Sequence, residues 1–425
     1  MVAEGGGSPR LRQANRQQLS WQTFDLDGLV GPRHIARTIW QFLDKLNLDG
    51  FYADIKAREG VAGRDATDPK ILLTLWLYAL SRGVASAREL DRLCREHDAY
   101  KWICGGVSVN HHLLSDFRIE QGGAVDELLS QILAVLVHKR VLKLRRIAQD
   151  GTRVRASAGA ASFRRKKTLD NCLTQARDHI KALNAEAANP DPQRSARVRS
   201  ARQRAARERE QRIAQARAEY DQLAAAKATA KNHPQRKKEP RASTTDPQAR
   251  VMKMPDGGFR PAYNLQFGTD TETRLVVGVT ATNAGTDTNQ LEPMLDDIQR
   301  RTTIIPAQAL LDGGYMNFAG VEQATARAVA VFAPLRKNKS YKIDPYQVQP
   351  RDSAAIAAYR QRMASEQGKL IYKQRAATAE TINADTKTYR GLDRLLVRGL
   401  PKVLFAGLWS ALTYNVLRII SKGWL

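Results

Sequence analysis

Two aspartates of this chain follow or interrupt apolar segments, and each is followed directly by glycine. Asp150 stands in "RIAQDGTRVR" and Asp312 in "ALLDGGYMN". Asp-Gly is a common turn dipeptide, so a turn without chemistry is the simpler interpretation of each. If each aspartate instead ends a strand, and the two strands are neighbours, both carboxylates lie at one sheet edge. That arrangement suits Mg²⁺, and two such ions can support phosphoryl transfer.

A third carboxylate for such a site is expected on a later helix. Glu380, in "IYKQRAATAETINADTK", is the candidate, and Asp385 or Glu366 is the alternative if a third acid exists at all. Lys387 follows Glu380 by seven residues, two helical turns, so both face the same side and the lysine could hold a phosphate there. Asp270, in "FGTDTET", is instead interpreted as the start of a hairpin turn.

The composition favours a nucleic-acid partner. The chain has 425 residues, 43% of them hydrophobic, a net charge of +25 and a pI of about 10.2. Such an excess of positive charge points to a polyanion. An anionic membrane is the alternative, but the longest uncharged apolar runs, 71–81 and 403–417, are shorter than a span needs, so no membrane association is expected.

The N-terminus and the cysteines predict a cytoplasmic location. "MVAEGGGSPR" lacks the apolar segment of a signal peptide. Cys94, Cys104 and Cys172 form no CxxC pair, which fits a reducing compartment and argues against a zinc finger.

The first third of the chain predicts a disordered tail, residues 1–18, and a helical, DNA-binding domain, residues 19–140. Asp68-Pro69 is an N-cap followed by proline at the first helical position. Residues 86–118 could form a helix-turn-helix whose second helix, Asn110 to Arg118, enters the major groove. Three packed helices without a DNA role would give the same pattern. His111 and His112 are assigned to a helix end or to packing.

Residues 141–425 predict an α/β domain with a mixed sheet, interrupted by an insertion at residues 160–250. A strand at 141–155 ends near Asp150, and the order β–β–α–β–α–β follows the insertion. The insertion is a basic helical hairpin, broken at 189–192, with a linker at 231–250. A polar connection at 336–370 precedes two last helices, which are expected at 371–390 and 400–421.

These motifs together resemble a DDE transposase of bacterial insertion sequences, with a ribonuclease-H-like core. In that family the third acid lies in a Tyr-x2-Arg-x3-Glu-x6-Lys signature. The chain has Tyr372, Arg375, Glu380 and Lys387, with four rather than three residues between Arg375 and Glu380. "QDGTRVRA", "GGFRPAYNLQFGTD", "LLDGGYMN" and "HHLLSDFR" extend the resemblance over most of the chain.

The resemblance implies a mechanism and a set of residues. Asp150, Asp312 and Glu380 would bind two Mg²⁺ ions, with Mn²⁺ able to substitute. Metal-activated water would cut double-stranded DNA at the element's ends, and the freed 3′-OH would attack target DNA. A homodimer on DNA, in the bacterial nucleoid, would pair two ends. The residues assigned to DNA are Tyr372, Arg375, Lys387, Arg153, Arg155, Arg197, Arg199, Arg202 and Arg204.

Two other functions remain open from the sequence. A nuclease or junction resolvase on the same fold would share the metal site without strand transfer. A DNA-binding descendant of a transposase would lack catalysis altogether. The basic hairpin fits all three functions, and its arginines could also be a solvated coiled-coil face.

Overall fold

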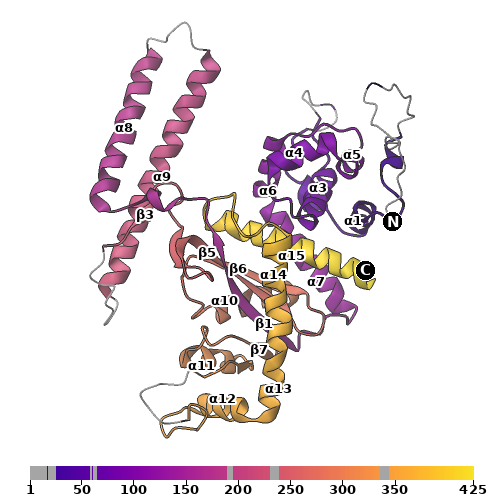
Figure 1. The fold of residues 1–425 in the computed structure, drawn as a ribbon, viewed down its shortest axis with the longest axis vertical. Coiled ribbons are helices and arrows are strands. Elements are labelled where there is room, and N and C mark those ends of the chain that lie inside the picture. Colours follow the sequence, from indigo (N-terminus) through magenta and orange to yellow (C-terminus); the bar gives the residue numbers. More distant parts are fainter. Residues whose placement is uncertain are drawn as a thin grey trace, which may run out of the picture.

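The computed structural model describes residues 17, 25–57, 60, 65–188, 195–229, 239–335 and 344–425. A helical N-terminal region and a long helical hairpin flank a central mixed sheet (Figure 1). The predicted tail at 1–18, apart from Gln17, the break at 189–192 and the first part of the linker, 231–238, lie outside the described residues.

The N-terminal region is helical, as the sequence predicts. Its buried centre is α3, Pro69–Ser81, which begins with the predicted cap: the Asp68 carboxylate accepts a hydrogen bond from the Lys70 backbone N–H at 2.8 Å. Gly83, with φ of 78°, ends this segment. The other elements are η1 (Asp27–Leu29), α1 (Ile35–Leu43), α2 (Asp49–Tyr52), α4 (Ala87–Glu96), α5 (Asp98–Cys104), α6 (His111–Glu120) and α7 (Gly122–His138).

The central sheet has the order β4-β5-β1-β7-β8, and β6 also pairs with β5. The strand β5 is antiparallel to β1, β4 and β6, whereas β7 is parallel to β1 and to β8. Strands β5 to β8 alternate with two helices in the predicted order β–β–α–β–α–β, and β4 is an additional strand before them. The strands are β1 (Arg146–Arg155), β4 (Arg250–Lys253), β5 (Phe259–Asp270), β6 (Val276–Thr282), β7 (Gln308–Leu310) and β8 (Ala330–Phe332).

The prediction that the first strand ends at Asp150 is wrong. β1 continues to Arg155, because β5 pairs with it from Ile147 to Arg155. Only the other neighbour ends early: β7 pairs with β1 at residues 146–148 and then leaves the sheet. Asp150 thus lies in the middle of a strand, where one edge of that strand becomes free.

Helices cover both faces of the sheet. α10, Leu291–Thr302, packs so closely that a Cβ added at Gly268 or Gly278 would lie 2.6 or 2.5 Å from the Met294 sulfur. On the other face, α15, Leu400–Lys422, places Gly407 against Leu265 and Val279. Glycines in the strands and in α15 therefore permit close layer packing.

α15 corrects an expectation about apolar segments. Its 23 residues are long and apolar enough to cross a membrane, whereas the sequence run 403–417 suggested a shorter segment. However, 72% of its most apolar window is buried inside the protein. Since Asn415 also hydrogen-bonds both backbone groups of Val276 in β6, the structure uses this helix as a core element.

The C-terminal region contains more helix than the sequence predicts. Within the expected polar connection at 336–370, the structure has α12, Ala354–Ala364, and the start of α13, Glu366–Arg375. A π turn, η4 (Ala376–Glu380), joins α13 to α14, Thr381–Tyr389. α11, Phe318–Ala326, lies beside α12.

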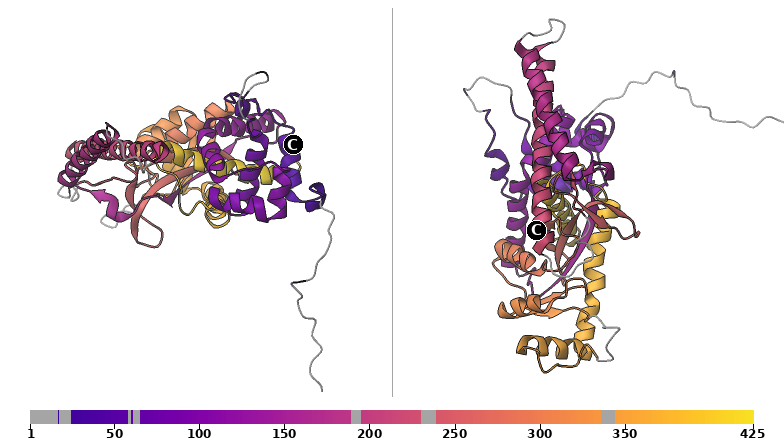
Figure 2. Two further views of the ribbon diagram at one scale, coloured as in Figure 1. Left: turned by 90° about the horizontal axis from the view of Figure 1, so that it is seen from above. Right: turned by 90° about the vertical axis from the view of Figure 1, so that its left-hand side faces the viewer.

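The insertion is a helical hairpin, as predicted, and it extends away from the sheet (Figures 1 and 2). Its arms are α8, Lys166–Ala188, and α9, Ala196–Thr229. A short 3-10 turn, η2 (Ala160–Ser162), precedes them, and β2 (Phe163–Arg164) pairs with β3 (Ala242–Ser243) at the base. The linker prediction is wrong for residues 239–250, because Ser243 and Asp246 are fully buried there.

Candidate active site

Asp150 and Asp312 lie side by side at the edge that β7 leaves free. Ala148 of β1 is level with Leu310 of β7, and each aspartate lies two residues further along its parallel chain segment. The structure thus brings the two predicted carboxylates together. Gly313 and Gly314 follow Asp312 in a turn, in which the Gly314 N–H donates to the Asp312 carboxylate. The turn and the acid pair are therefore parts of one arrangement.

Asp150 is held by groups from the helix that crosses it. Its Oδ1 lies 3.0 Å from Arg375 Nη2, and its Oδ2 accepts a hydrogen bond from Asn383 Nδ2 at 2.8 Å. Burial raises the pKa of Asp150, an effect that the Arg375 charge opposes and the Asp312 charge reinforces. The carboxylate is thus placed in a low-dielectric site that favours a counter-cation.

The extra residue between Arg375 and Glu380 is absorbed by the π turn. A π turn closes hydrogen bonds between residues five apart, so it accommodates one residue more than an α turn. Arg375 and Glu380 are five apart, and Arg375 Nη1 lies 3.5 Å from Glu380 Oε1. Arg375, which is 12% exposed, thus links the first predicted acid to the third.

The alternative third acids lie in other settings. Asp385 pairs with Arg390 at 2.5 Å. Glu366 is 90% exposed at the far end of α13 and pairs with Lys369. Glu380 therefore has the best position of the three, although its side chain is 62% exposed and lies at the rim rather than beside Asp312.

Tyr372 and Lys387 both face this site. Tyr372 is half-buried, and burial raises its pKa. The Arg375 charge opposes this rise, and the charges of the three acids reinforce it. Burial lowers the pKa of Lys387, with Asp150 acting in the opposite direction. Among the described residues, the Lys387 side chain has no hydrogen-bond or ion-pair partner. Its ammonium is therefore available to an anionic ligand.

Asn383 and Asp287 were missed from the sequence. Asn383 lies three residues after Glu380, so helical spacing could have placed it on the same face. Asp287 comes from an irregular segment before α10, which no periodicity marks. Its Oδ1 accepts hydrogen bonds from Asn264 and Gln266 of β5, both at 2.7 Å. The predicted turn role of Asp270 is confirmed, since it accepts from the Thr273 backbone N–H at 2.7 Å.

The oxygen atoms around Asp150 are of the chemical types that bind a hard divalent cation. Carboxylates and amide oxygens are the ligands that Mg²⁺ prefers. Buried side-chain oxygens of Gln149, Asn264 and Asn383 have no hydrogen-bond partner in the described part of the chain. Among the described residues, however, no three Asp, Glu, His or Cys side chains stand at the spacing of a complete metal site. The donor set is therefore suitable, but Glu380 stands apart from the aspartate pair.

Comparison with known families identifies this arrangement. A family model described as "Transposase DDE domain" matches residues 228–416. A second, described as "Transposase domain (DUF772)", matches residues 24–120. The chain belongs to the DDE transposases of insertion sequences. No curated protein and no solved structure matches it. The mixed sheet of this transposase is accordingly a ribonuclease-H-like core, preceded by a helical N-terminal region.

The basic hairpin of the transposase has an inner and an outer set of arginines. Arg202 pairs with Glu186 of the other arm, and Arg199 is partly buried. Arg197 and Arg204 are exposed and have no ion pair among the described residues. Helical spacing places this second pair on the face turned away from α8. Only part of the predicted arginine set therefore points outward.

The two arginines at the end of β1 already have protein partners. Arg153 donates to the Gly285 carbonyl at 3.1 Å, and Arg155 pairs with Asp393 at 3.0 Å. Arg155 remains 46% exposed, so it can still meet a phosphate. Lys387 lies within electrostatic reach of both Asp150 and Arg153.

The predicted recognition helix has few groups that suit DNA. Arg118 of α6 stacks over Trp76 and donates to the Ala85 carbonyl at 2.7 Å, and burial lowers its pKa to about 10. The exposed charged positions of α6 are Asp116 and Glu120. The structure has α4, α5 and α6 where two helices were suggested.

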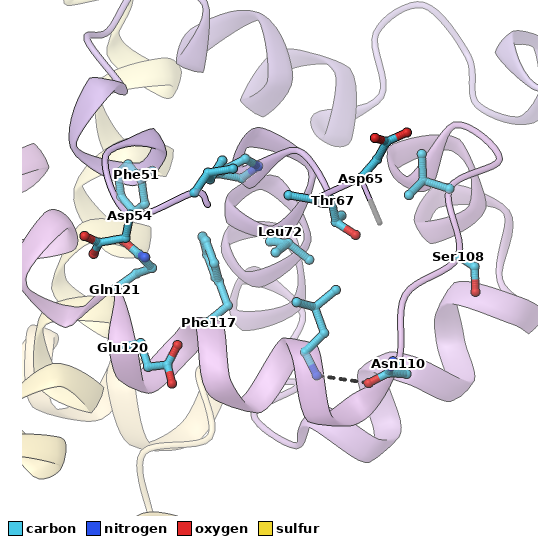
Figure 3. A pocket seen from close by; sticks show the side chains of 15 residues that line it. Phe51, Asp54, Asp65, Thr67, Leu72, Ser108, Asn110, Phe117, Glu120 and Gln121 are labelled. Atoms are coloured by element: carbon cyan, nitrogen blue, oxygen red, sulfur yellow. Dashed lines mark hydrogen bonds between the residues drawn. The ribbon is translucent and has the colours of Figure 1, made fainter. Parts of the chain in front are cut away.

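A cavity of about 690 Å³ opens beside α6, between α2, α3 and the segment before α6 (Figure 3). Its floor is apolar, with Leu72 and Phe117, and Asp54, Asp65 and Glu120 stand around it. None of its described lining residues is Lys, Arg or His. This face of the transposase would repel a phosphate backbone, so the structure favours packed helices over a recognition helix at 110–118.

Proposed function

We propose that this transposase binds the ends of its insertion sequence, cleaves the DNA and joins the ends to target DNA by two-metal phosphoryl transfer. The observation that carries the proposal is the level placement of Asp150 and Asp312 on adjacent parallel segments. Glu380 is linked to them through Arg375, which contacts both Asp150 and Glu380. When bound, Mg²⁺ or Mn²⁺ would activate the attacking oxygen and stabilise the leaving one.

The surrounding residues have separate tasks in this proposal. Lys387, partly buried and without a partner among the described residues, would hold the phosphate next to the scissile one. Tyr372 would pack against the DNA end on the same helical face. Asn383 orients Asp150 through its 2.8 Å hydrogen bond. These roles require no covalent protein–DNA intermediate, so no Ser or Tyr nucleophile is needed.

The outward hairpin arginines, Arg197 and Arg204, would contact DNA further from the site. A homodimer that pairs two ends would act in the cytoplasm, on nucleoid DNA. A nuclease without strand transfer, or a silent DNA-binding descendant, remains the alternative, since both would share the same fold.

A joining assay tests the proposal. Purified protein, Mg²⁺, a plasmid carrying the native flanking DNA and a target plasmid are incubated, with Glu380→Ala and Asp150→Asn beside the wild type. Glu366→Ala is the matched control, because this exposed acid lies at the far end of α13. Joined products that vanish in the first two variants and persist in the control would support the proposal.

The other outcomes favour the alternatives. Cleavage without joining would indicate a nuclease. DNA binding without either reaction would indicate a silent descendant. Joining that survives in Glu380→Ala but not in Asp150→Asn would remove Glu380 from the reaction while keeping the transposase function.

A further inference from the structure

Asp287 is fixed beside Gly151, the residue that follows Asp150, by buried amides. Asn264 and Gln266, which donate to its Oδ1, are 1% and 0% exposed. Gln266 is opposite Gly151 of β1. A Cβ at Gly151 would overlap Asp287 Oδ1 and the Gln266 amide, so only glycine after Asp150 permits this approach. The position of Asp287 therefore depends on the glycine at position 151 of β1.

The other carboxylate oxygen of Asp287 faces the turn that carries Asp312. A Cβ placed on Gly314 would lie 2.7 Å from Asp312 Oδ1 and 3.7 Å from Asp287 Oδ2. The adjacent Thr288 hydroxyl donates to the Gly314 carbonyl at 3.2 Å. The segment of Asp287 and the turn of Asp312 are thus joined, with both carboxylates directed at one small space.

The three aspartates share one electrostatic environment. Tyr315 is buried beneath them, and its pKa is raised by burial and then by the charges of Asp287, Asp150 and Asp312. Asp287 also adds to the raised pKa of Asp150. Like charges gathered in a low dielectric repel one another, and a divalent cation relieves that repulsion.

We propose that Asp287 is a further acidic residue of this centre, beside Asp150, Asp312 and Glu380, whose negative charge strengthens the binding of a divalent cation by Asp150 and Asp312. The inference rests on the proposed function, because that function supplies the cation. Asp287 acts through the field and through the turn of Asp312, not as a direct ligand. Asp287 is therefore a positioning residue. It lies between the sheet and the Asp312 turn, whereas Glu380 lies at the exposed rim of the site.

Two nearly matched substitutions separate charge from structure. Asp287→Asn removes the charge but keeps an oxygen that can accept from Asn264 and Gln266. Asn264→Ala removes one of those donors but keeps the charge. Mn²⁺ binding to each full-length chain, without DNA, is measured by electron paramagnetic resonance, and the thermal unfolding midpoint is measured in EDTA.

We expect Asp287→Asn to bind Mn²⁺ at least about tenfold more weakly, the scale seen when residues around a metal's direct ligands are changed. Its midpoint in EDTA should equal or exceed that of the wild type, since a repulsive charge is gone. Asn264→Ala should lose less Mn²⁺ affinity than Asp287→Asn, despite a lower midpoint, because the charge remains.

Three outcomes would overturn the inference: no measurable Mn²⁺ binding by the wild type, Asp287→Asn within threefold of it, or an equal loss in Asn264→Ala. Failure of the proposed function has a different signature. A wild-type chain that joins no DNA, but shows the expected Mn²⁺ affinities, would refute transposition and leave the role of Asp287 standing.

Discussion

The π turn between α13 and α14 makes a sharp prediction about single-residue deletions. Removing Ala377, which is exposed within η4, should convert the π turn into an ordinary α turn. Arg375 and Glu380 would then be four apart in a continuous helix and would still share a face. Residues after the turn would keep their orientation, because the π turn had absorbed one surplus residue.

A deletion in the regular part of the helix provides the contrast. Removing Ala384, exposed in α14, would rotate every later residue by about 100° and shift it by about 1.5 Å. Lys387 would leave the site, and the buried residues Thr386 and Arg390 would be displaced from the core. We expect a loss of about 3 kcal/mol or more of unfolding free energy for Ala384, because several buried side chains are displaced together, against a change of about 1 kcal/mol for Ala377.

Both deletions are compared by urea unfolding and by the joining assay. The Ala377 deletion should fold and retain joining, whereas the Ala384 deletion should lose both stability and joining. The reasoning would be refuted if the Ala377 deletion were inactive while the Ala384 deletion remained active. Equal damage from both would also contradict it, since the π turn would then have no surplus residue to release.

Three further predictions concern charge and packing. Burial lowers the pKa of Lys387, so its positive charge is lost at a lower pH than that of an exposed lysine, and Lys387→Arg should extend DNA cleavage to higher pH in a pH–rate profile. Gly151→Ala should destabilise the fold, whereas Gly159→Ala, whose added Cβ would have no neighbour within 4 Å, should be neutral in thermal unfolding. Replacing Arg197 and Arg204 by alanine should flatten the salt dependence of DNA binding by up to about 0.9 per lost phosphate contact, and an unchanged slope would make the hairpin a scaffold.

The order of strands and helices along the chain from β5 to β8, and the placement of Asp150 and Asp312 on neighbouring strands, could be predicted from the sequence. Apolar strand patterns and the glycine after each aspartate carry that information. The continuation of β1 beyond Asp150 could not be predicted, because it depends on β5 pairing along its whole length. Residues far apart in the sequence decide where a strand ends.

The contributions of Asn383 and Asp287 were harder to predict for different reasons. Asn383 lies on a predicted helix. Its role could not be predicted, because the sequence does not show that this helix crosses β1 at Asp150. Asp287 comes from an irregular segment, and its place is fixed by the buried amides Asn264 and Gln266. In strand patterns such amides indicate only polar interruptions, whereas in the structure they position a carboxylate.

The base of the hairpin allows the length of the hairpin to vary independently of the catalytic sheet. Strands β2 and β3 pair the two chain segments that flank the hairpin, while α9, with 34 residues against 23 in α8, continues past this base (Figure 1). A helix rises about 1.5 Å per residue. Adding or removing matched turns in both arms would therefore lengthen or shorten the hairpin by a set increment while β1 and β7 keep their register. The length of the hairpin can therefore change during evolution without altering the catalytic sheet.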